Sequence, residues 1–225
     1  MHIEPGIVTG AKIALSYATA AAAAGFTLRS VTETLREKGL LSLAMRSLIA
    51  TVATFVFFQV LPHAPVGVSE VHLILGSTLF LLFGAAPAAI GLAMGLLLQG
   101  VFFAPFDLPQ YGMNVTTLLV PLFAVRALAT TIIAPQTAYV DLSYKQALAL
   151  SSAYQGGIVL WVGFWAFYGQ GISIETLASV GSFGAAYMTV VLLEPLVDLL
   201  VLAGAKSLRD LPASGVFTTR LFNAA

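Results

Sequence analysis

The chain has 225 residues, of which 59% are hydrophobic and 9% are charged. A soluble domain carries ~25% charged residues, so this composition indicates an integral membrane protein. The 10 basic residues balance the 10 acidic ones, which leaves no basic field for nucleic acid. There is no Cys, which excludes disulfides, thiolate zinc sites and iron–sulfur clusters.

Seven apolar stretches are candidates for membrane-spanning helices, because a helix needs ~20 apolar residues to cross and fewer where its neighbours shield it. They cover residues 6–26, 43–61, 71–83, 87–103, 114–133, 147–168 and 177–203. The third stretch is short, and Gly84-Ala85-Ala86-Pro87 predicts a tight turn before a helix that begins at the proline. No segment is long enough for a separate soluble core, so residues 1–225 are predicted to form one all-α, polytopic bundle.

The first stretch is not expected to be a cleaved signal peptide. Such a peptide starts with a positive region, followed by a short apolar stretch and a cleavage site. Here Glu4 precedes the first basic residue, Lys12, and the basic cluster follows the apolar span. The sequence therefore favours a retained first helix.

Basic residues set the predicted orientation, because they concentrate on the cytoplasmic side of membrane proteins. With seven spans and the N-terminus outside, the inner segments hold Arg29, Arg36, Lys38, Arg46, Lys145, Lys206, Arg209 and Arg220. The C-terminus is then cytoplasmic, and residues 29–42, which are polar and favour helix, are predicted to form an interfacial helix. The three histidines, His2, His63 and His72, all fall on the outer side.

The Met1-His2 start is a candidate metal chelator. The amine of Met1, the amide nitrogen of His2 and the ring Nδ1 of His2 can occupy three corners of a square. A fourth nitrogen would complete a planar set that suits Ni(II) or Cu(II), and His72, at the outer mouth of a helix, is the natural donor. The dipeptide alone is better explained as a start codon followed by a chance histidine. His72 on the same side favours the metal site.

Other outer residues have two interpretations each. His63 lies in the loop Leu61-Pro62-His63-Ala64-Pro65, where it is an entry or spare ligand or, more simply, a solvated loop histidine. Polar or soft side chains at the outer ends of the fourth and fifth spans belong to Gln99, Met113 and Asn114. Asn114 either supports a metal-bound histidine by a hydrogen bond or caps the fifth helix.

Three charged residues lie within predicted spans, where charge is costly and is usually paired or functional. They are Arg126, Glu194 and Asp198. We favour an ion pair between Arg126 and Glu194 or Asp198, which would join the fifth and seventh spans, or an Arg126 side chain that reaches the inner interface. The alternative is that they contact a partner subunit.

Several motifs are missing from the sequence. No phosphate-binding loop of the G-x-x-x-x-G-K-[ST] type occurs, and neither GxSxG nor HExxH is present. Two similar halves, which would mark an inverted-repeat transporter, are also missing. We therefore expect neither an ATPase nor another enzyme.

Residues in four blocks resemble one known family. The start MHIEPG is similar to the MHI-x-x-G opening of the CbiM/NikM family, the substrate-capture subunits of cobalt and nickel energy-coupling-factor transporters. PVGVSEVHL, from Pro65 to Leu73, resembles that family's segment before its second metal-binding histidine. LLQ with GVFF, and GMNV from Gly112, resemble later blocks.

The resemblance implies seven helices, with the N-terminus folded into the outer core of the bundle. It implies that the transported ion, cobalt or nickel, is held by the Met1 amine, the His2 amide and imidazole, and the His72 imidazole. The implied partners are a membrane coupling subunit and two cytoplasmic ATPases, in the inner membrane of a prokaryote. The competing hypothesis from the residues is a solitary permease or channel for a divalent ion or small solute. An intramembrane enzyme is a third class, but no acid, base and nucleophile gather at one depth.

Overall fold

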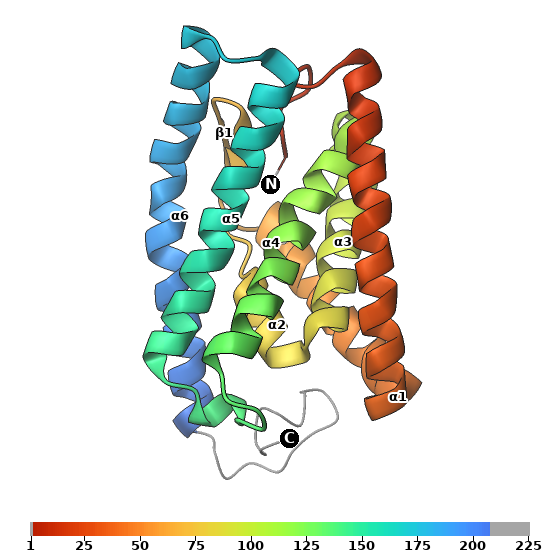
Figure 1. The fold of residues 1–225 in the computed structure, drawn as a ribbon, viewed down its shortest axis with the longest axis vertical. Coiled ribbons are helices and arrows are strands. Elements are labelled where there is room, and N and C mark those ends of the chain that lie inside the picture. The colour runs from red at the N-terminus through yellow and green to blue at the C-terminus, as the bar shows by residue number, and fades with distance from the viewer. Residues whose placement is uncertain (1, 208–225) are drawn as a thin grey trace.

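A computed structural model describes residues 2–207, which fold into an upright bundle of helices (Figure 1). Five helical stretches among these residues are long and apolar enough to cross a membrane, which confirms the predicted all-α membrane bundle. The longer helices are α1 (Ala14–Gln59), α3 (Ala85–Phe102), α4 (Tyr111–Ile132), α5 (Tyr144–Gln170) and α6 (Ile174–Ser207). The shorter elements are η1 (Gly10–Ile13), β1 (Ala64–Val66), β2 (Ser69–Val71), α2 (Gly76–Phe83), η2 (Pro105–Gln110) and η3 (Tyr139–Asp141).

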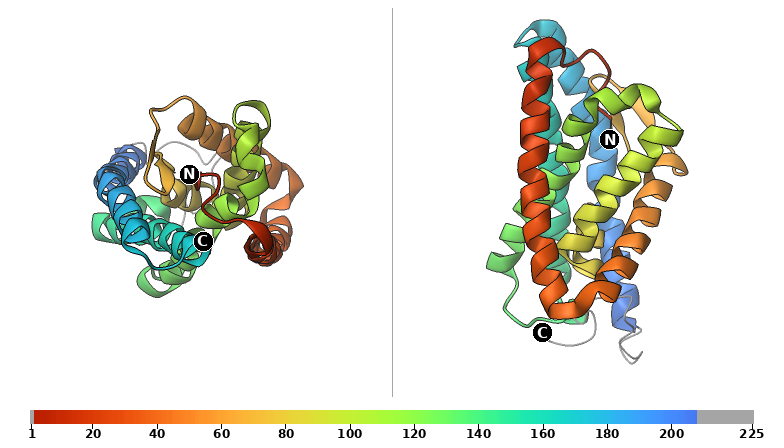
Figure 2. Two further views of the ribbon diagram at one scale, coloured as in Figure 1. Left: turned by 90° about the horizontal axis from the view of Figure 1, so that it is seen from above. Right: turned by 90° about the vertical axis from the view of Figure 1, so that its right-hand side faces the viewer.

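Helix α1 is bent into two arms at Gly39. The backbone there has φ 79° and ψ 170°, outside the helical region and open mainly to glycine. One arm runs down the bundle, and the other runs back up it from the bend (Figure 2, right). Residues 29–42, predicted to form a separate interfacial helix, are instead the end of the first arm, the bend and the start of the second.

The third predicted span is only partly helical. Val71 ends β2, residues 72–75 are irregular, and α2 has eight residues. At 1.5 Å per residue such a helix rises only ~12 Å, less than half of a ~30 Å hydrocarbon core. Gly84, with φ 92°, separates α2 from α3 as the sequence predicted, although α3 begins at Ala85 rather than at the proline.

Small residues let the second arm of α1 approach α3 closely. A Cβ atom added to Gly91 would lie 2.4 Å from the Cβ of Ala50, and one added to Gly95 would lie 2.6 Å from the Cβ of Thr54. Both distances are shorter than any real carbon contact, so only glycine fits at these two crossings. This close packing without large side chains is typical of helices that associate in lipid.

The N-terminal segment enters the interior of the bundle from one end (Figure 2, left). Ile3 forms an antiparallel bridge with Ser69, and the N–H of Glu4 donates to the carbonyl of Val68 at 3.1 Å. The segment therefore adds to the edge of the β1–β2 hairpin. It also passes over α5 at Gly169, where an added Cβ would lie 2.0 Å from the carbonyl oxygen of Ile7.

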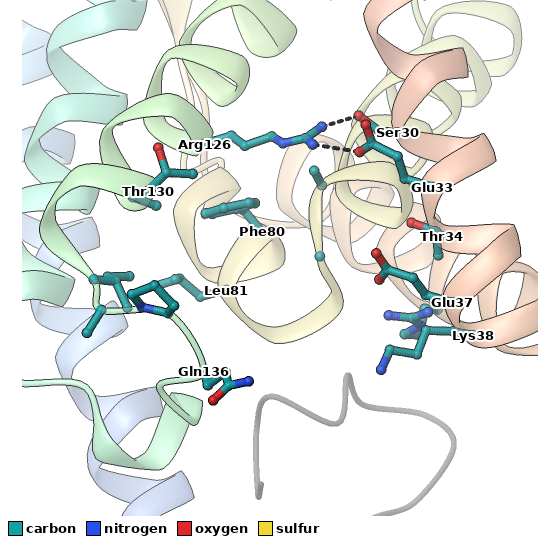
Figure 3. Close-up of a pocket in the computed structure, with 17 residues that line it drawn as sticks. Ser30, Glu33, Thr34, Glu37, Lys38, Phe80, Leu81, Arg126, Thr130 and Gln136 are labelled. Atoms are coloured by element: carbon teal, nitrogen blue, oxygen red, sulfur yellow. Dashed lines mark hydrogen bonds and ion pairs between the residues drawn. The ribbon is translucent and has the colours of Figure 1, made fainter. Parts of the chain in front are cut away.

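The charged residues within the bundle pair differently from the prediction. Nη2 of Arg126 lies 2.7 Å from Oε2 of Glu33, and its Nη1 donates to the hydroxyl of Ser30 (Figure 3). The predicted pair with Glu194 or Asp198 is wrong, because α4 presents Arg126 to the first arm of α1. The spacing of residues along the chain predicts neither the bend in α1 nor which side chains of α1 face α4.

Candidate functional site

His2 is buried, with 2% of its surface exposed, and its backbone is held on both sides. The hydroxyl of Ser69 and the N–H of Glu70 each donate to the His2 carbonyl at 2.9 Å. The N–H of Ile3 donates to Oδ1 of Asn114 at 2.8 Å. The hairpin and α4 together therefore set the position of the His2 ring in the bundle.

His72 is buried just beyond the end of β2. Its Nε2 lies 2.8 Å from Oε2 of Glu70, and its Nδ1 is buried with no hydrogen-bond partner. A carboxylate accepts a hydrogen bond from Nε2–H, so the lone pair of the neutral ring lies on Nδ1. A carboxylate behind an imidazole is the usual way in which proteins orient a histidine toward a metal.

The two imidazoles face a common space. Their ring centroids are 5.6 Å apart, and the buried ring of Phe58 lies 5.3 Å from His72 and 6.5 Å from His2. Ligand-type atoms of His2, Glu70 and His72 all lie within 4.8 Å of one another. This spacing is short enough for one metal ion to contact several of them.

Asp107 is a site residue that sequence reasoning missed. It lies in η2, is 4% exposed, and places Oδ2 2.7 Å from Nδ1 of His2. Only the fold brings it there, since more than a hundred residues separate it from His2. Glu70 was also missed, although a local signal existed: residues two apart on a strand point to the same side, and Glu70 precedes His72 by two.

Burial lowers the pKa of His2, and this effect outweighs the opposing influence of the Asp107 carboxylate. Burial thus favours the neutral imidazole, which is the form that binds a metal ion.

The other predicted outer residues lie at different distances from this pair. His63 is exposed, and its ring stacks on that of His72 with centroids 4.9 Å apart and 14° between the planes. Gln99 and Met113 are buried, and Oε1 of Gln99 has no hydrogen-bond partner. Asn114 lies within α4, which begins at Tyr111, so it does not cap that helix. It contacts the segment that carries His2.

Met1, the third predicted metal-binding residue, lies outside the described residues, as do Arg209 and Arg220 of the basic inner segments.

Glu194 and Asp198 of α6 hold the chain that leads from His72 into α2. The Glu194 carboxylate accepts hydrogen bonds from the N–H groups of Ile74 and Leu75 and from the side-chain amide of Gln155. The N–H of Leu75 lies 2.9 Å from Oε2. One turn along, Asp198 accepts a hydrogen bond of 2.6 Å from Ser77. The two acids thus bind the N-terminal end of α2, where a helix carries partial positive charge.

Taken together, the fold and the site define a multi-pass helical membrane protein that carries a buried pair of imidazoles inside its bundle. The sequence model of the family described as "Cobalt uptake substrate-specific transmembrane region", CbiM, matches residues 2–210. The chain belongs to this family of cobalt uptake proteins. No curated protein and no solved structure matches the chain.

Proposed function

We propose that the chain captures a divalent transition-metal ion, cobalt or nickel, as a subunit of an ATP-driven energy-coupling-factor importer. The observation that carries this proposal is the buried pair of His2 and His72, which the N-terminal segment and the β1–β2 hairpin bring together. Membership of a cobalt uptake family supports the same class of substrate. The chain itself then carries no enzymatic activity.

The proposed ligands are four nitrogens. They are the amine of Met1, the amide and Nδ1 nitrogens of His2, and the free Nδ1 of His72. Such a planar set suits a square-planar divalent ion. Nδ1 of His2 faces Asp107, so an ion bound at this nitrogen would take the place of that contact. The carboxylate of Asp107 would then remain nearby and offset part of the positive charge of the ion. Because the ring of His63 covers that of His72 and is exposed, His63 is proposed to lie on the entry path.

We further propose seven passes with the N-terminus outside. In this topology each arm of α1 crosses once, the chain from β1 through α2 forms the third pass, and α3 to α6 complete the bundle. The bend of α1, the start of α5 and the end of α6 lie at one end (Figure 1). Basic residues gather there, which supports a cytoplasmic assignment in the inner membrane of a prokaryote. They are Arg29, Arg36, Lys38, Arg46, Lys145 and Lys206.

Uptake measurements test the role as a subunit. We expect cells that express this chain alone to accumulate no cobalt or nickel against a gradient. Co-expression with a membrane coupling subunit and its ATPases should restore accumulation, since the sequence has no nucleotide-binding loop of its own. Accumulation by the chain alone that resists depletion of ATP would contradict the proposal and would favour the solitary permease.

Glu70 is proposed to orient His72 rather than to bind the ion, because its carboxylate already engages Nε2. The substitution Glu70→Gln removes the charge and lets an amide donor face Nε2. We expect metal affinity to fall about 10- to 100-fold, as is typical when the partner of a metal-bound histidine changes. Isothermal titration with Ni(II) or Co(II) measures this loss. Glu175→Gln, at an exposed acid on α6, is the matched control and should bind as tightly as the unchanged chain. An unchanged affinity in Glu70→Gln would remove Glu70 from the site.

Glu194 is proposed to position His72 through the backbone that follows it. In Glu194→Gln, one carboxylate oxygen becomes an amide group, so at least one of its three N–H donors loses its acceptor. We expect about 10-fold weaker metal binding and a lower unfolding temperature, because a buried donor left without an acceptor costs about 1–3 kcal/mol. Metal titration and thermal unfolding in the same detergent measure the two effects. A variant that is less stable yet binds metal as tightly as the unchanged chain would show that Glu194 serves the fold alone.

A further inference from the structure

A pocket with charged and apolar residues on its wall lies at the end of the bundle that carries the bend of α1. Its volume is about 480 Å³, and it opens between α1, the turn from α2 to α3, and the end of α4 (Figure 3). Arg126 and Glu33, which form an ion pair, lie on its wall, and the apolar part of the wall includes Phe80 and Leu81.

Arg46 is the unusual member of this pocket. It is 2% exposed, and no carboxylate among the described residues forms an ion pair with it. Its Nε donates to the carbonyl of Ser42 at 3.1 Å and its Nη1 to that of Phe83 at 2.8 Å. Nη2 is buried and has no hydrogen-bond partner among residues 2–207. A buried guanidinium with neither a counter-charge nor a full set of acceptors is costly, so an anion at this point would be stabilised.

The N-terminus of α3 faces the same pocket. Gly84 and Ala85 line it, and a Cβ added to Gly84 would lie 3.8 Å from Nη1 of Arg46. No side chain caps α3, an 18-residue helix, and its first turn contains no acidic residue. The first N–H groups of a helix have no acceptor within it and carry partial positive charge, so they commonly bind phosphate.

We propose that this pocket binds a phosphate group, held between the Nη2 of Arg46 and the first N–H groups of α3. Guanidinium and helix N-terminus are the two donors that proteins most often direct at phosphate oxygens. Glu33 and Glu37 also line the pocket, and Arg126 offsets the charge of Glu33. The pocket is larger than a lone oxyanion needs, and its apolar wall suits the glycerol and first methylenes of a phospholipid. The source of the phosphate is thus an anionic lipid headgroup or free phosphate.

Two measurements on the full chain distinguish these sources. The first is native mass spectrometry from micelles that contain equal amounts of phosphatidylglycerol and phosphatidylcholine. The second is the unfolding temperature of delipidated protein in inorganic phosphate against chloride at equal ionic strength. Selective retention of phosphatidylglycerol supports the proposal with a lipid as the source. A rise in unfolding temperature with phosphate, without retained lipid, supports it with free phosphate as the source. If phosphatidylglycerol is not selectively retained and phosphate does not raise the unfolding temperature, the proposal is overturned.

Variants test the proposed residues. Arg46→Gln should lose lipid retention or bind phosphate about 10-fold or more weakly, because it loses a charge-assisted hydrogen bond. Arg36→Gln, on the same helix but exposed and outside the pocket, is the matched control and should behave as the unchanged chain. Equal binding by Arg46→Gln and the unchanged chain would overturn the assignment.

A second variant covers the case in which Arg46→Gln fails to fold. Ala85→Asp places a carboxylate at the start of α3, so the chain supplies its own anion beside Arg46. We expect a higher unfolding temperature without phosphate and no further rise when phosphate is added. A response to phosphate equal to that of the unchanged chain would overturn the proposal. The metal site is at a different part of the fold, so neither variant should change metal affinity.

Discussion

Replacing His72 with alanine is expected to weaken metal binding strongly. His72→Ala removes the free Nδ1 that we propose as the fourth ligand, and it leaves the remaining nitrogens on one N-terminal strand. The loss should exceed the 10- to 100-fold effect that is usual for residues that only support a ligand. Titration of the purified chain with Ni(II) and Co(II) measures it, and circular dichroism checks that the helices persist.

His63→Ala is the matched control for this experiment. Its ring stacks on that of His72 but is exposed, and its Nδ1 lies 3.1 Å from the carbonyl of Leu61. We expect its removal to change metal affinity much less than His72→Ala and to act mainly on the rate of entry. If His63→Ala proves the more damaging of the two, the ligand comes from the loop rather than from the end of β2.

Extending the chain before Met1 is expected to abolish tight metal binding while the protein still inserts into the membrane. An added residue turns the proposed amine ligand into an amide and places new atoms in the interior of the bundle. His2 is already 2% exposed, so little room remains for the extension. A formyl group retained on Met1 should have the same effect. The measurement is metal titration of an extended and an unextended form, with the mass of each N-terminus verified.

A C-terminal extension of equal length is the control for that prediction, since it leaves the amine free. Equal metal affinity in the N-terminally and C-terminally extended forms would exclude the amine as a ligand. The proposed set would then reduce to the two imidazoles and a carboxylate such as that of Glu70, whose ligand-type oxygen lies within 4.8 Å of those of both histidines.

Much of the candidate site lay within reach of sequence reasoning because its key residues carry rare chemistry. With three histidines in an otherwise apolar chain, His2 and His72 were natural partners, and the structure places their rings 5.6 Å apart. Asp107 could not be paired with His2 in this way. Acidic residues at the outer ends of helices are common, and only the packing of η2 against the N-terminal segment selects this one.

The charged residues within the bundle show more clearly what cannot be predicted from the sequence. Hydropathy places Arg126, Glu194 and Asp198 within helices, where charge needs a partner, but it does not say which helix face meets which. In the structure Arg126 pairs with Glu33. Glu194 and Asp198 instead accept hydrogen bonds at the start of α2. Glu194 accepts hydrogen bonds from backbone N–H groups because the third predicted span is not helical at residues 72–75, and a broken helix exposes N–H groups that a continuous one would satisfy.

The amino-acid sequence by itself determined the class of the protein, because apolar length and scarce charge leave a chain no stable place except a bilayer. It also singled out the two buried histidines, since polar groups in such a chain stand out against their surroundings. Only the tertiary structure decided what surrounds them. It bends α1 at Gly39, leaves the third predicted span only partly helical and pairs the N-terminal segment with the hairpin. The energies of such arrangements depend on which surfaces meet, and periodicity along one segment does not contain that information.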